Sequence, residues 1–168
     1  SRCVAASPSD TAPALVALEA TMLISNSSGE REVAAEDYFV GPANDIESTT
    51  VLRPGDILTG VRIPATWANA TFYFEKVADR NVWDFALVNI AAAFKLSGGN
   101  IEDARIVAGA VQATPRRLTG VEDAIRGHAK NSATAESVME LATDGARALA
   151  HNGFKIPLLQ NLVKRAIA

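Results

Sequence analysis

The stretch FALVNIAAAFKLSGGNIEDARIVAGAVQ, residues 85–112, decides how the chain folds. Two apolar runs flank the short segment SGGN, and glycines at such a place suit the tight turn of a hairpin. The alanine-rich residues 89–94 would in isolation also suit a helix. Two runs of similar length on either side of a turn are better explained as paired strands. We therefore predict a β-hairpin here.

Further strands are predicted on the N-terminal side of this hairpin. The segments alternate apolar and polar residues or are rich in aromatic ones, as half-buried strands are. They are residues 21–25, 31–34, 57–64 and 72–78. Residues 36–56 are rich in Gly, Pro, Asn and Asp, which predicts a long loop with one short helical turn near Tyr38.

Helical signals begin at Thr119. The tetrad TGVE has the spacing of a capping box, in which Glu122 bonds back to the start of its helix. A second helix is predicted from Ser132 until Gly153 stops it, and Pro157 can open a third. The sequence thus predicts a small sheet followed by three helices.

Composition excludes several classes of function. The chain has 168 residues and a net charge of −3, with no basic stripe, so nucleic-acid binding is not expected. No apolar run reaches the length of a membrane span, and a single cysteine excludes an internal disulfide. Glycine-rich phosphate loops, nucleophile elbows and zinc motifs are absent, and we expect no metal ligands. Because the first residue is serine, we expect a processed or truncated piece.

The opening SRCVAASPSDTAPALVAL, residues 1–18, places Ser9 and Asp10 before a helix. With Asp10 as the N-cap, Pro13 falls at the third helical position, where it costs no intrahelical hydrogen bond. On one interpretation Asp10 only accepts backbone N–H bonds and caps the helix. On the other, the free N–H groups and the helix dipole face a ligand.

A polar loop follows the strand at residues 72–78. It gathers Asp79, Arg80 and Asp84, which a solvated charge cluster explains, but it also holds Trp83. A tryptophan beside charges can plug an interface between domains or form a platform for a flat ligand.

Five blocks along the chain carry a resemblance to a known family. They are CVAASPSDTAPALVALEA, LRPGDILTGVRIP, FEKVADRNVWDFALVNIAAAF, ARIVAGAVQATPRRL and FKIPLLQNLVKRAI. In this order they resemble the FAD-binding medium subunit of the xanthine dehydrogenase family of molybdenum hydroxylases, closest to the bacterial aldehyde dehydrogenase type. The resemblance implies an α+β chain. Residues 1–64 would be the C-terminal half of the FAD-binding domain, a partial α/β subdomain. Residues 65–168 would resemble the C-terminal domain of CO dehydrogenase flavoproteins, a three-stranded antiparallel sheet with a three-helix bundle.

The resemblance also assigns roles to residues, none of them catalytic. The positions that match the family's flavin contacts are Ser9, Asp10, Leu58 and Lys76. Leu58 is explained equally well as plain core. The loop at residues 77–84 matches a family segment that influences access of the electron acceptor, which makes Arg80 and Trp83 candidates for that role.

The function implied is that of the FAD subunit of a molybdenum hydroxylase, in the cytoplasm or periplasm. It would take electrons from iron–sulfur clusters and pass them through FAD to an external acceptor. Its partners would be an iron–sulfur subunit and a large subunit that holds the molybdenum cofactor. The family's glycine-rich FAD loop has no counterpart here, so we expect this chain alone to bind FAD weakly or not at all. We also expect an exposed apolar surface that favours self-association. The alternative is a docking or assembly module that holds no cofactor, and bound flavin would distinguish the two by its yellow colour.

Overall fold

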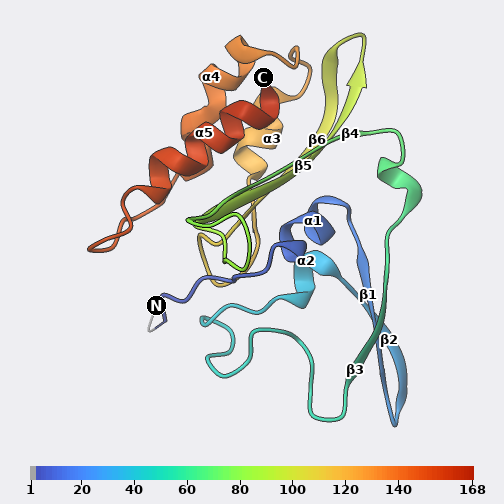
Figure 1. Ribbon diagram of the computed structural model, residues 1–168. Coiled ribbons are helices and arrows are strands. Elements are labelled where there is room, and N and C mark those ends of the chain that lie inside the picture. The colour runs from blue at the N-terminus through green and yellow to red at the C-terminus, as the bar shows by residue number, and fades with distance from the viewer. Residues whose placement is uncertain (1–2) are drawn as a thin grey trace.

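The computed structural model describes residues 3–168 as two antiparallel sheets with helices packed on them (Figure 1). The smaller sheet has the strand order β2-β1-β3, and the larger has the order β4-β5-β6-β7. This arrangement confirms the predicted α+β class.

The helices and strands follow the predicted order. The first half holds α1 (Thr11–Ala17), β1 (Thr21–Asn26), β2 (Gly29–Ala34), α2 (Ala35–Tyr38) and β3 (Ile57–Arg62). After the 3-10 turn η1 (Ala65–Trp67), the larger sheet contains β4 (Thr71–Val77), β5 (Val88–Ser97), β6 (Asn100–Gly109) and β7 (Arg116–Arg117). The C-terminal helices are α3 (Thr119–Ile125), α4 (Ser132–Val138), the 3-10 helix η2 (Met139–Thr143) and α5 (Lys155–Ile167).

The predicted hairpin is present as β5 and β6. Gly98 and Gly99 form its turn with φ of +58° and +86°, in the left-handed region that glycine enters without steric cost. Strand β5 is buried on both faces, which explains why its apolar residues run on without alternation. The alanine-rich segment is therefore a strand because of its tertiary surroundings.

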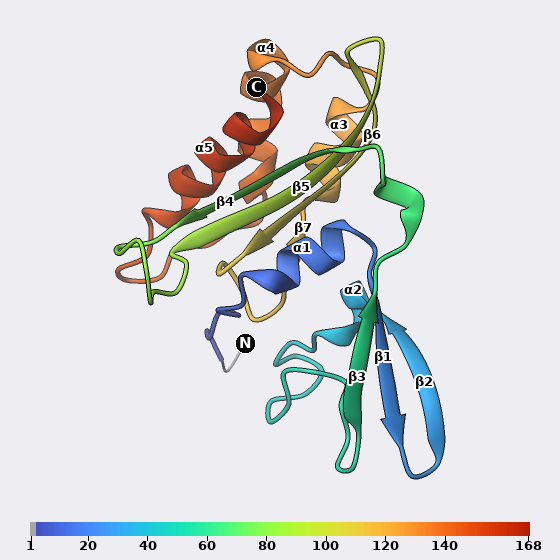
Figure 2. The same cartoon turned by 45° about the vertical axis from the view of Figure 1, so that its right-hand side comes forward.

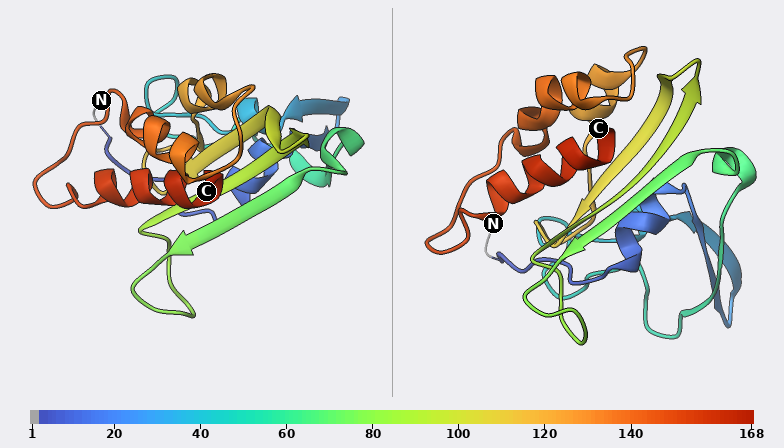
Figure 3. Two further views of the ribbon diagram at one scale, coloured as in Figure 1. Left: turned by 90° about the horizontal axis from the view of Figure 1, so that it is seen from above. Right: turned by 45° about the horizontal axis from the view of Figure 1, so that its top comes forward.

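The larger sheet lies between two helical layers (Figure 2 and Figure 3). Helices α3, α4 and α5 cover one face, where Ile90 and Phe94 of β5 are fully buried. Helix α1 covers the other face and packs on Ala91 of β5 and Val107 of β6. The same small core takes in Met22 and Ile24 of β1, so α1 holds the two sheets together.

Charged side chains join the two halves of the chain around Arg105 of β6. Its guanidinium donates to Glu19 Oε1 at 3.0 Å and to Glu36 Oε2 at 2.9 Å, and its side chain is only 9% exposed. Trp67 Nε1 donates to the other carboxylate oxygen of Glu19 at 2.8 Å. These contacts fix the first sheet and η1 against the middle of the second sheet.

Apolar side chains are exposed on β3 and β4, which are each an edge strand of their sheet. On β3 and just after it they are Ile57, Val61 and Ile63, and on β4 they are Phe72 and Phe74. Exposed apolar side chains, as expected, are thus present on these strands, and the self-association expected of such a surface stays a prediction.

Three details differ from the sequence prediction. The predicted three-stranded sheet gains a fourth, two-residue strand, β7. The predicted capping box is wrong, because Glu122 is buried and accepts hydrogen bonds from the Ile106 N–H at 2.8 Å and from Arg117 instead. The second helix does not continue to Gly153. It ends after α4 and η2, because Gly145 follows with a φ of +69°, a left-handed conformation that a helix cannot continue through.

Within residues 3–168, no helix combines the length and the apolar content that crossing a membrane requires.

Candidate functional site

The N-terminus of α1 is capped by Ser9 and not by Asp10. Ser9 Oγ accepts the Ala12 N–H at 3.1 Å, whereas the Asp10 side chain makes no capping hydrogen bond. Pro13 occupies the third helical position, as predicted. The interpretation of Asp10 as a simple cap is therefore wrong, because its carboxylate is engaged elsewhere.

Asp10 instead forms an ion pair with Lys76, near the end of β4. Lys76 Nζ lies 2.6 Å from Asp10 Oδ2 and also donates to the Asp84 carbonyl oxygen at 2.6 Å. The Lys76 side chain is 26% exposed and that of Asp10 is 43% exposed, so solvent or a ligand can reach both. Lys76 thus ties the start of α1 to the loop after β4.

Asn89 of β5 completes this cluster, and the sequence analysis did not identify it. It pairs with Lys76 across the strands and is fully buried. Its Nδ2 donates to Asp10 Oδ1 at 3.0 Å, which holds the second carboxylate oxygen. Its Oδ1 has no hydrogen-bond partner among the described residues. The available signal was a lone amide inside an otherwise apolar run.

The loop after β4 surrounds a pocket of about 380 Å³ whose lining includes Lys76, Arg80 and Trp83. Arg80 closes the loop: its backbone N–H donates to Asp84 Oδ2 at 2.9 Å and its Nη2 to the Trp83 carbonyl at 2.6 Å. The Arg80 N–H is the main cause that lowers the pKa of Asp84. Trp83 is 93% exposed and has a φ of +55°, a strained backbone for a residue with a side chain. The loop therefore presents an exposed indole from a backbone that Arg80 holds.

Aromatic side chains extend the site along β4. Phe72 and Phe74 alternate with Tyr73 and lie on the same face of the strand as Lys76. Both phenylalanines are about half exposed, at 54% and 51%. They line an apolar pocket of about 190 Å³ together with Ala14, Ala17 and Leu18 of α1. An apolar surface thus leads along α1 and β4 toward the Lys76–Asp10 pair.

The remaining candidate, Leu58, lies on a different sheet. It belongs to β3, pairs with Ile24 of β1 and is 38% exposed. Figures 1 and 2 both place β3 away from the end of β4. The structure thus brings together Ser9, Asp10, Lys76, Arg80 and Trp83 but not Leu58, whose assignment as a flavin contact stays a prediction.

Two family models match the chain. Residues 1–66 match the FAD binding domain in molybdopterin dehydrogenase, and residues 73–168 match the CO dehydrogenase flavoprotein C-terminal domain. The first match contains Asp10 and the second contains Lys76.

Individual proteins are similar over the same residues. The glyceraldehyde dehydrogenase medium chain of Sulfolobus acidocaldarius is 37% identical over 123 residues, which are 73% of this chain and 41% of that protein. The FAD-binding subunit of the Escherichia coli aldehyde oxidoreductase is 28% identical over 99% of this chain and 49% of its own length. In the crystal structure of quinoline 2-oxidoreductase from Pseudomonas putida, a chain that is 30% identical superimposes with a TM-score of 0.82. That match covers 97% of this chain and 56% of the other. The chain spans about half the length of the curated relatives it matches.

Proposed function

The chain belongs to the family of FAD-binding medium subunits of molybdenum hydroxylases, and on that premise we propose that it relays electrons through FAD to an external acceptor. The electrons would come from iron–sulfur clusters in a partner subunit. The organic substrate would be oxidised in another partner, a large subunit with the molybdenum cofactor. The name "medium chain" of the Sulfolobus relative describes one chain of a larger assembly, which supports the existence of partner subunits.

The Lys76–Asp10 pair is the observation that carries the proposal. A flavin ring has an apolar end and a polar edge with both carbonyl and N–H groups. Lys76 can donate to such a carbonyl, and Asp10 can accept from such an N–H. The half-exposed Phe72 and Phe74 lie on the same face and suit the apolar part of the ring. The residues present therefore fit the group.

Each residue of the site has a distinct task in this proposal. FAD, when bound, would supply the redox chemistry. Lys76 holds a positive charge at the polar edge of the ring, which favours the form that carries more negative charge. Asp10 orients the Lys76 ammonium through its 2.6 Å contact, and Ser9 caps the helix that carries Asp10. Arg80 and Trp83 would control how the electron acceptor approaches through the loop after β4.

We propose further that the chain has two domains, residues 1–64 and 65–168. The two family matches end and begin on either side of residues 67–72, which supports a boundary near η1. The site residues come from both parts, since Asp10 lies in the first and Lys76 in the second. FAD would then bind where the two domains meet.

The proposal is tested in the complete subunit purified with its partners. We expect one FAD per subunit, and about tenfold weaker FAD binding in Lys76→Met or Asp10→Asn, since charge-assisted hydrogen bonds contribute about 1.5–3 kcal/mol. Lys164→Met is the matched control, because Lys164 forms a comparable 2.7 Å ion pair with Glu136 on α4. A complete subunit without flavin would support the docking module instead. Equal affinity in all variants would remove Lys76 and Asp10 from the site.

A further inference from the structure

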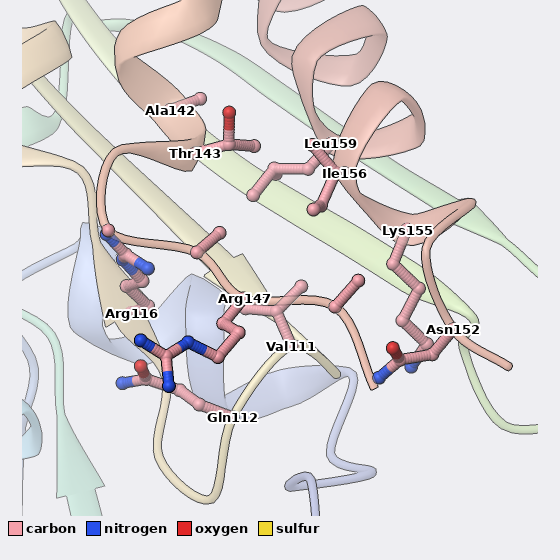
Figure 4. Close-up of a pocket in the computed structure, with 13 residues that line it drawn as sticks. Val111, Gln112, Arg116, Ala142, Thr143, Arg147, Asn152, Lys155, Ile156 and Leu159 are labelled. Atoms are coloured by element: carbon pink, nitrogen blue, oxygen red, sulfur yellow. The ribbon is translucent and has the colours of Figure 1, made fainter. Parts of the chain in front are cut away.

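A second pocket lies in the C-terminal part of the chain, where η2, the segment before α5 and the loop after β6 meet (Figure 4). Its volume is about 240 Å³, just below the range of about 300–1,000 Å³ for drug-sized ligands, so the pocket suits only a small molecule. The residues that line it include Val111, Gln112, Arg116, Ala142, Thr143, Arg147, Asn152, Lys155, Ile156 and Leu159. None of the residues predicted to contact FAD is among them.

Three cationic side chains line this pocket without a carboxylate beside them. They are Arg116, Arg147 and Lys155, and no aspartate or glutamate is part of the lining. In the described part of the chain, none of the three forms an ion pair. This concentration of positive charge stands out in a chain whose net charge is −3.

The hydrogen bonds of these cations leave donors free for a ligand. Arg116 Nη2 donates to the Asp144 carbonyl at 2.7 Å, and Lys155 Nζ donates to the Ala110 carbonyl at 2.9 Å. A guanidinium has five N–H donors and an ammonium has three, so both groups retain free ones. Burial without a counter-charge lowers the pKa of Lys155, and a bound anion would relieve that cost.

The charges lie on two sides of an apolar floor. In Figure 4, Arg116, Arg147 and the amide of Gln112 gather on one side, and Asn152 and Lys155 lie on the other. The side chains between them are apolar, namely those of Val111, Ile156 and Leu159. Asn152 Oδ1 accepts the Leu149 N–H at 2.6 Å, so its Nδ2 is left as a donor toward the pocket.

We propose that this pocket binds a small organic dianion, with a carboxylate at each end and a short apolar middle. Arginine suits the first carboxylate, because its planar guanidinium matches the two oxygens of that group. Lys155 and Asn152 take the second carboxylate, and the apolar floor packs against the methylene groups between. The site lies apart from the Lys76–Asp10 pair, so it stands whether or not the chain binds FAD.

Titration calorimetry of the purified chain with glutarate tests this site. We expect saturable millimolar binding, at least fivefold tighter than for butyrate, which has a similar apolar part but one carboxylate. Arg147→Met should weaken glutarate binding about five- to tenfold, as expected for a partly solvated charge-assisted hydrogen bond. Arg53→Met removes the same charge from an exposed position in the loop before β3 and should leave binding unchanged.

Arg147 is exposed, so its replacement should not affect folding, and circular dichroism of each variant checks this. Lys155→Met provides a second variant at the opposite end of the pocket. The proposal is overturned by the absence of saturable glutarate binding, or by equal binding in the Arg147 and Arg53 variants. Equal affinity for butyrate, or for inorganic phosphate, would also overturn it. Binding would then depend neither on a second carboxylate nor on the apolar segment between the two carboxylates.

Discussion

Lys76 Nζ and Asp10 Oδ2 lie 2.6 Å apart, although 66 residues separate the two in sequence. Lys76 is the next-to-last residue of β4, the edge strand of the larger sheet, and Asp10 immediately precedes α1 on that sheet's face. The pair forms because α1 packs across β5 and β6 and brings its N-terminus to the end of β4. A contact between residues so distant in sequence depends on the packing of α1 on the larger sheet.

The first prediction concerns the redox potential of the complete subunit. Lys76→Met removes a positive charge beside Asp10 and leaves that carboxylate unpaired. Both changes make the surroundings more negative, so the FAD midpoint potential should fall. At an effective dielectric of about 20, Coulomb's law gives an interaction energy of about 4 kcal/mol between two unit charges about 4 Å apart, before desolvation and screening are subtracted. A quarter of that, about 1 kcal/mol, corresponds to about 20 mV for a two-electron couple.

A spectroelectrochemical titration measures this potential, with Lys164→Met as the control of equal charge change. An unchanged potential in a Lys76→Met subunit that still holds stoichiometric FAD would contradict the assignment. Lys76 would then be a structural residue only.

The second prediction tests the packing behind Asp10. A Cβ added at Gly109 would lie 2.0 Å from Asn89 Oδ1 and 2.7 Å from Pro13 Cγ, closer than atoms can approach. Gly109→Ala should therefore destabilise the chain by about 1–3 kcal/mol, as overpacking does. Gly120→Ala in α3 meets no atom within 4 Å and should be neutral or stabilising. Urea unfolding of the two variants compares them, and equal stabilities would refute the close packing.

The third prediction concerns Arg105, which connects Glu19 and Glu36 of the first half to β6. Removing a buried cation leaves its partners uncompensated, which costs about 3–5 kcal/mol for fully buried pairs. Because Glu19 and Glu36 are 39% and 44% exposed, we expect about 1–3 kcal/mol for Arg105→Met. Arg126→Met, at a 52% exposed position, should change stability by less than about 0.5 kcal/mol. Similar losses in both variants would contradict a joining role for Arg105.

The fourth prediction concerns acid stability. Asp56 accepts the Arg53 N–H, an Arg31 guanidinium N–H and an Asn26 amide N–H, and these bonds lower its pKa from 3.8 to about 2. Because folding lowers the pKa of Asp56, its carboxylate stabilises the folded chain at pH values above the ordinary pKa of 3.8. This stabilisation is lost as the pH falls from 3.8 toward 2. Asp56→Asn should lower stability at neutral pH and flatten this acid dependence. Asp123→Asn, at an exposed position, should leave the profile unchanged, and a steep profile in Asp56→Asn would argue against the assignment.

Much of this fold follows from local sequence, and the departures have tertiary causes. The β5–β6 hairpin was predictable because its glycine turn and its two apolar runs are local signals. Glu122 and Asp10 each have good capping chemistry, yet both carboxylates bond to another strand, Glu122 to the Ile106 N–H of β6 and Asp10 to Lys76 of β4. Local rules cannot anticipate such competition.

The site could be predicted only in part. The resemblance singled out Asp10 and Lys76, which the structure brings into contact. The sequence does not show that Asn89 and the exposed Phe74 belong to the site, because only the strand pairing places Asn89 beside Lys76 and Phe74 on the same face. The cations of the second pocket come from separate segments of the chain, so no spacing in the sequence reveals them.

The packing of α1 on β5 and β6 also governs the order in which the chain can fold as it is synthesised. Asp10 leaves the ribosome 79 residues before Asn89, its partner on the sheet. Until the later hairpin exists, the apolar stripe of α1 has nothing to cover it, and closing so long a loop is slow compared with forming local turns. The C-terminal sheet and helices contain mostly closer neighbours and can assemble first. Helix α1 is made before the sheet that it packs on and is thus among the last parts of this chain to settle, and in that interval it is exposed to chaperones and proteases.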